Sequence, residues 1–98
     1  MELFKVRILK LVTTIHGAGL SALLAYDLEL PFPPTENMYL SALPGGESVV
    51  GPLTKCTFEC ASGQFFCEVE PQILNTPNFS DVVLAHEATG WNTLLTNP

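Results

Sequence analysis

The chain has 98 residues, a formal net charge of −6, 47% hydrophobic residues and only 14% charged residues. This length is typical of one domain, so we expect residues 1–98 to form a single domain with one core. Phosphate backbones are bound by clustered Lys and Arg, but the chain has only four bases, three of them in the first ten residues. We therefore expect no direct binding of nucleic acid. The acidic composition favours a protein partner with a basic face, and the low charge content favours self-association as the alternative.

No apolar run approaches the ~20 residues that a membrane-spanning helix needs, so we expect no membrane segment. The early bases followed by apolar residues 11–25 resemble a signal peptide, but Thr13, His16 and Ser21 interrupt the run. Three cysteines, an odd number, argue against a secreted disulfide scaffold. The sequence therefore predicts a cytoplasmic protein.

Alternation of apolar and polar residues predicts two long strands near the N-terminus. Residues 2–10 place Phe4, Val6 and Ile8 on one face, and the β-branched residues that follow can extend this strand as far as Ile15. The glycine-containing segment 16–19 then allows the chain to reverse. Residues 21–30 alternate in the same way, which predicts a second strand antiparallel to the first and ended by the prolines that follow.

A hairpin is the clearest pattern in the second half of the chain, after a short strand at Met38–Leu43 and an extended pair at Val49-Val50. Two alternating runs, 54–60 and 65–70, flank a short connection that contains Gly63. The predicted register sets Cys60 opposite Phe65, Phe58 opposite Cys67, and Cys56 opposite Val69, with these six residues on one face. The other face then carries Lys55, Thr57, Glu59, Phe66, Glu68 and Glu70.

Residues 80–89 are predicted to form a helix, with Ser80-Asp81 at its start, Gly90 just beyond its end and Trp91 packed against its last turn. The alternative for Val82–His86 is a strand, because Val-Val-Leu is typical of strands. Residues 92–98 are expected to fray. The fold class is therefore mainly β (β-rich α+β): a small, bent, antiparallel SH3-like barrel of about five strands with a short C-terminal helix.

The three cysteines are predicted to fill the core as small hydrophobic residues, because the hairpin register turns them all inward. One alternative is a zinc-stabilised domain in which Cys56, Cys60 and Cys67 bind zinc together with His16 or His86. The other alternative is a disulfide between Cys67 and either Cys56 or Cys60. The spacing of the cysteines along strands is not that of a zinc knuckle, so we expect no metal and no other cofactor.

Catalysis is not expected, because no recognisable catalytic motif is present. A thiol nucleophile would need a base beside it, and a carboxylate pair drawn from Glu59, Glu68 and Glu70 would need an enclosing pocket. An enzyme that uses a thiol or a carboxylate pair is thus a remote alternative.

Phe66 is the one aromatic residue on the predicted acidic face, among Glu59, Glu68 and Glu70. Such an arrangement is typical of an interface in which an aromatic anchor is surrounded by a charged rim. The alternative is that the helix or the N-terminal segment covers Phe66. The sequence thus predicts a small acidic, non-enzymatic interaction module, such as an inhibitor, an immunity-type protein or an adaptor, that binds a basic protein surface through these four residues.

Overall fold

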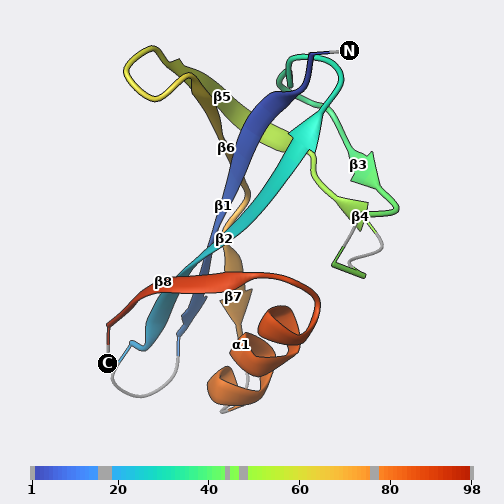
Figure 1. Cartoon of the computed structure of the whole chain (residues 1–98). Helices are drawn as coiled ribbons and strands as arrows, with labels where there is room; N and C mark the ends of the chain where they lie inside the picture. Colours follow the sequence, from blue (N-terminus) through green and yellow to red (C-terminus); the bar gives the residue numbers. More distant parts are fainter. Residues whose placement is uncertain (1, 16–18, 44, 47–48, 76–77, 98) are drawn as a thin grey trace.

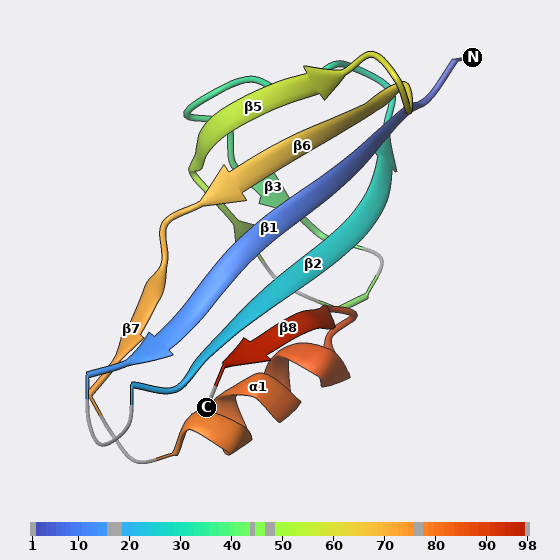
Figure 2. The ribbon, with the colours of Figure 1, turned by 90° about the vertical axis from the view of Figure 1, so that its left-hand side faces the viewer.

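The computed structural model describes residues 2–15, 19–43, 45–46, 49–75 and 78–97. These residues form a mainly β fold in which one short helix lies against one end of a long, twisted sheet (Figures 1 and 2). The elements in chain order are β1 (Phe4–Thr14), β2 (Ser21–Leu30), β3 (Leu40–Ser41), β4 (Val49–Val50), β5 (Leu53–Glu59), β6 (Gln64–Val69), β7 (Gln72–Leu74), α1 (Phe79–Ala88) and β8 (Asn92–Asn97).

The main sheet is mixed and open. Its strand order is β5-β6-β1-β2-β8, and β7 pairs with β1 beyond the end of β6. β1 is antiparallel to β2 but parallel to both β6 and β7, so the prediction of an entirely antiparallel sheet is wrong. Within the described residues β5 and β8 remain at opposite edges, and closure into an SH3-like barrel is not shown.

The first two strands lie where the alternation placed them. β2 spans the predicted residues 21–30, and β1 extends through the β-branched residues to Thr14. The backbone N–H of Thr14 donates to the carbonyl of Leu20 at 3.0 Å, which holds the two strands together near their connection. This N-terminal hairpin supplies the central strands of the sheet.

The end of the chain corrects one prediction. Residues 92–97, expected to fray, form β8 and pair antiparallel with β2 along its first half. Pairing satisfies backbone N–H and C=O groups that an unpaired edge of β2 would expose. The predicted strand Met38–Leu43 is also shorter than expected, since only Leu40–Ser41 pairs, with Val49–Val50.

The predicted helix is confirmed, and its last turn ends as expected. α1 begins at Phe79 after Asn78 rather than at Ser80, and no side chain caps its first turn. At the other end the N–H of Gly90 donates to the carbonyl of Glu87 at 3.3 Å, and the N–H of Trp91 donates to that of His86 at 3.2 Å. This pair of bonds is a Schellman motif, which requires the left-handed backbone of Gly90, with φ of 106°.

The predicted hairpin forms, but its register is shifted. β5 pairs with β6 so that Cys56 lies opposite Cys67, Phe58 opposite Phe65, and Glu59 opposite Gln64. The turn therefore comprises residues 60–63, closed by Gly63 with its left-handed φ of 67°. The shift changes every predicted cross-strand partner by two positions, so each strand residue keeps the face of the sheet predicted for it. Cys60, however, moves from the strand into the turn.

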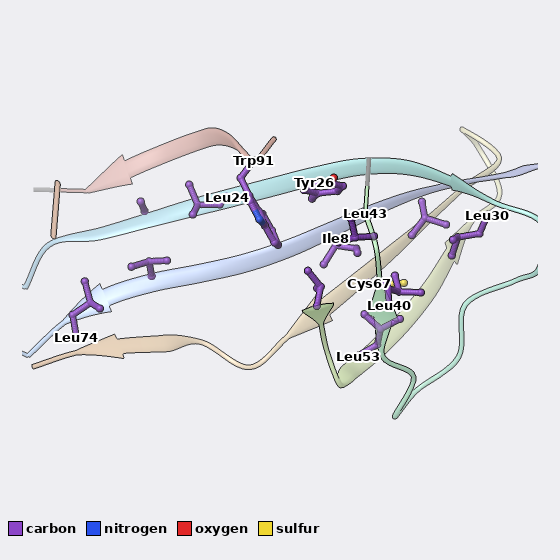
Figure 3. Packing of buried hydrophobic residues seen from close by; sticks show 14 residues of the cluster. Ile8, Leu24, Tyr26, Leu30, Leu40, Leu43, Leu53, Cys67, Leu74 and Trp91 are labelled. Carbon is purple, nitrogen blue, oxygen red and sulfur yellow. The ribbon is translucent and has the colours of Figure 1, made fainter. Parts of the chain in front are cut away.

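One face of the sheet is covered by two layers, which lie on the same side of β1 and β2 in Figure 1. The β3–β4 pair packs over the part of the sheet near Ile8 and Leu53, and Trp91 lies over the part near Leu24 (Figure 3). α1 packs against the same core through Phe79, Val82 and Val83. The buried core comprises Val6, Ile8, Val12, Ala22, Leu24, Tyr26, Leu30, Leu40, Leu43, Val50, Leu53, Cys67, Leu74 and Trp91.

Candidate interaction surface

The opposite face of the sheet, called the outer face below, is covered by no described element. Because successive residues of a strand point to opposite sides, the outer face carries the residues that alternate with the core positions. On β1 these are Lys5, Arg7, Leu9, Leu11 and Thr13, and on β2 they are Ser21, Leu23, Ala25, Asp27 and Glu29. The face is therefore charged at the end near β5 and apolar at the end near β8.

The charged half contains paired charges of opposite sign. The guanidinium of Arg7 donates two hydrogen bonds to the Asp27 carboxylate, at 2.7 Å and 3.0 Å, and the bond to Asp27 raises the pKa of Arg7. Lys5 lies opposite Glu29 in the neighbouring strand. Lys55 lies opposite Glu68, not opposite Glu70 as the predicted register would place it. Three of the four bases of the chain thus lie on this face.

The structure brings together three of the four predicted binding residues. Glu59, Phe66 and Glu68 occupy the outer face of the β5–β6 hairpin. Phe66 is half-buried and lies between Thr57 on one side and Arg7 on the other. α1 packs on the opposite face, so the helix does not cover Phe66, and β1 lies beside it within the sheet.

Glu70 stands apart from the other three. It follows β6 at the break before β7, where it lines a groove on the outer face together with Glu68. It also lines a smaller cleft on the core side. Glu70 therefore lies at the edge of the predicted binding surface rather than within it.

The apolar half of the outer face exposes large aliphatic side chains. Leu11 is 39% exposed, Ile73 on β7 is 62% exposed and Leu95 on β8 is 68% exposed. Ile73 is the cross-strand neighbour of Thr13, and Leu95 is that of Leu23, which places both on the outer face. The adjoining groove has a volume of about 590 Å³ and is lined by Leu9, Leu11, Leu23, Thr54, Glu68, Val69, Glu70 and Pro71.

The cysteines occupy three different environments. Cys67 is fully buried in the core, Cys56 is half-buried opposite it, and Cys60 is exposed in the turn. The prediction that all three face inward is therefore wrong for Cys60. Burial raises the pKa of Cys67 to about 12, and a hydrogen bond with the Cys56 side chain acts in the same direction.

The raised pKa of Cys67 makes its contribution to stability depend on pH. Above its unfolded pKa, near 9, the unfolded chain loses the thiol proton that the folded chain retains. The stability due to Cys67 is thus present below pH 9 and falls as pH rises towards 12. We expect the difference in unfolding free energy between wild type and Cys67→Ala to shrink from pH 8 to pH ~10.5, within this window.

Urea unfolding under reducing conditions measures this difference, and Cys60→Ala, which removes the exposed thiol, is the matched control. A difference that stays constant for Cys67→Ala across this range would contradict the buried, protonated thiol.

Within the described ranges, no three His, Cys, Asp or Glu side chains are grouped so that they could hold a metal ion. The predicted zinc ligands are divided between the core, the hairpin turn and α1, and His16 lies outside the described residues. The alternative of a zinc-stabilised domain is therefore not supported by the part of the chain that is described.

A polar cleft that the sequence analysis missed lies between the two covering layers. Lys10 occupies a core-face position between Ile8 and Val12, and its ammonium donates to Nε2 of His86 at 2.9 Å. Nδ1 of His86 is 2.8 Å from the carbonyl oxygen of Val82, which can only accept, so Nδ1 is the donor of this hydrogen bond. The ammonium also lies 5.8 Å from the centre of the Trp91 ring.

The cleft has a volume of about 140 Å³, room for a few water molecules, and Glu70 lies in its wall. Lys10 was the signal in the sequence, since it is a charged residue at an apolar position of the alternating strand. In this structure its hydrogen bond joins β1 to α1.

No protein-family model matches this chain, and neither does any curated protein or any solved structure. Among the described residues, no helix is both long enough and apolar enough to cross a lipid bilayer.

Proposed function

We propose that this protein is a small, non-enzymatic interaction module that binds another protein through its outer face. The observation that carries the proposal is the one-sided arrangement of the fold: both covering layers pack on the core face, and exposed aliphatic side chains remain on the other. Contiguous exposed apolar surface rimmed by polar residues is typical of protein interaction sites. An inhibitor, an immunity-type protein or an adaptor would each use such a face. The three free thiols favour the cytoplasm as the place of action.

Phe66 is suited to anchor a partner, because it is a half-buried aromatic residue within the charged half of the outer face, next to Arg7. Glu59 and Glu68 flank it on the hairpin and would supply electrostatic steering towards positive groups on the partner. Leu11 would extend the buried area into the groove. Aromatic anchors of this kind account for a large share of binding energy in protein interfaces.

We expect the double substitution Phe66→Ala/Leu11→Ala to weaken binding of the protein's partner by at least about tenfold, since truncating a hot-spot residue costs ~1–2 kcal/mol or more. Partners captured by the immobilised wild type are identified, and each is then titrated against wild type and variant. The control is Leu84→Ala, a large aliphatic residue that is 61% exposed on α1, away from the outer face. Equal affinities for the outer-face variant and wild type, with both folded, would contradict the proposal.

A further inference from the structure

We infer that the occupant of the outer face is a second copy of this chain, stacked on it about a two-fold axis that runs along the strands between β1 and β2. This inference rests on the proposed function, since it uses the same surface. A basic protein partner is less favoured, because Lys5, Arg7 and Lys55 lie on the outer face among its acids. A surface of mixed sign suits a partner of mixed sign.

The register of β1 and β2 carries the argument. A half-turn about the stated axis exchanges the positions of the two strands, so each β1 residue faces, in the second copy, the β2 residue that is its own cross-strand neighbour. Lys5 then meets Glu29 of the second copy, and Arg7 meets Asp27 of the second copy. Packed sheets keep their strand directions within about 30° of each other, so β1 and β2 incline slightly to the axis and the match loosens away from the point where the two sheets cross.

The apolar half of the same face is also self-complementary. Leu11 and Leu23 are cross-strand neighbours, so Leu11 of one copy meets Leu23 of the second copy, and Leu23 meets Leu11. The same half-turn carries β8 of the second copy over the β6–β7 side of the first. Leu95, 68% exposed, is thereby brought towards the groove beside Pro71. Each copy thus offers both a protruding side chain and a groove, as an isologous interface requires.

The dimensions and charge of the outer face are compatible with a stable dimer. β1 has 11 residues and is roughly 36 Å long, and four strands side by side are roughly 19 Å wide, giving a projected face of roughly 700 Å². A standard interface buries about 800 Å² on each partner. Two copies with a net charge of −6 each repel one another at most orientations. The outer face carries less of this charge, since its three bases stand against four acids, Asp27, Glu29, Glu59 and Glu68, which gives a net charge of −1, or −2 with Glu70 at its edge.

A charge-reversal experiment tests the two-fold geometry. Sedimentation equilibrium of the wild type, from about 1 to 300 μM at low salt, is expected to show a dimer of twice 10.6 kDa. Lys5→Glu and Glu29→Lys should each weaken dimerisation about tenfold, because each variant sets like charges against each other at both symmetry-related contacts. An equimolar mixture of the two variants should restore association to within a few-fold of the wild type, since opposite charges then meet at both contacts.

Glu36→Lys is the matched control, because it makes the same charge change at an exposed residue outside the sheet and should leave dimerisation unchanged. Circular dichroism and urea unfolding confirm that each variant is folded. A monomeric wild type at 300 μM, or single variants that dimerise like the wild type, or a mixture that does not recover association, would each overturn the inference. The two proposals can fail separately. If the wild type is monomeric but binds a captured protein, and the Phe66→Ala/Leu11→Ala variant no longer binds that protein, the proposed function stands and the second copy does not.

Discussion

Replacing Trp91 with alanine is expected to lower the free energy of unfolding by about 3–5 kcal/mol, the range measured for truncating buried large aromatic residues. Trp91 is only 2% exposed and lies where α1, β8 and the sheet meet. Its ring packs edge-on against Tyr26, with ring centres 5.4 Å apart, and against His86, with centres 5.8 Å apart. Loss of the indole would leave a cavity between the helix and the sheet, beside Lys10.

Urea unfolding at neutral pH, followed by circular dichroism, measures this loss. Leu84→Ala is the control, since Leu84 lies on the exposed side of the same helix and its truncation should change stability by no more than about 0.5 kcal/mol. If Trp91→Ala is too unstable to fold, Trp91→Phe, which keeps part of the ring volume, should retain an unfolding transition of intermediate stability. A loss below 1 kcal/mol for Trp91→Ala would contradict the packing of α1 against the core.

Replacing Gly45 with alanine is expected to cost about 1–3 kcal/mol or more, as substitutions that overpack a tight contact do. A Cβ at this position would overlap the carbonyl oxygen of Thr89 and would lie 2.7 Å from the Tyr26 hydroxyl. The N–H of Gly45 also donates a 2.5 Å hydrogen bond to that hydroxyl. The backbone of Gly45 is not left-handed, so the penalty is steric and reports the close approach of the two covering layers.

The measurement is the midpoint of thermal or urea unfolding, compared with that of Ser41→Ala. Ser41 is exposed on β3, close to Gly45 in the chain, and its substitution should be nearly neutral. Chemical shifts of the α1–β8 turn provide a second readout, because the overlap is with the backbone of Thr89. Unchanged stability together with unchanged shifts in this turn would show that the β3–β4 side does not approach α1 as closely as the structure places it.

The hairpin part of the candidate surface could be predicted from the sequence alone. Alternation placed Glu59, Phe66 and Glu68 together, and the two-position error in register left them together because it preserved the sides of both strands. The error arose because the closing residue of the turn is Gly63, with its left-handed φ, and local sequence permits a four-residue connection at either of two positions. The residues at the two boundaries of the turn changed as a result: Cys60 moved from the strand into the turn, and Gln64 moved from the turn into β6.

The charge balance of that surface could not be predicted in the same way. Phe66 was expected among carboxylates, but Arg7 is its neighbour, because β1 lies parallel to β6 at the centre of the sheet. Alternation specifies which side of a strand is apolar and says nothing about which strand lies next to it. The neighbouring strand depends on pairing between residues far apart in the chain, and this pairing forms only when the whole sheet folds.

By itself, then, the sequence determined the local elements: two alternating strands at 4–14 and 21–30, a hairpin around Gly63, and a helix ended by Gly90. Each of these follows from side-chain periodicity or from a glycine that tolerates a left-handed backbone. Only the tertiary structure decided the mixed strand order, the ordered β8 and the position of Lys10 between two covering layers. These features depend on backbone pairing between distant residues and on the face of the sheet against which β3–β4 and α1 pack. Neither is encoded in a local pattern of residues.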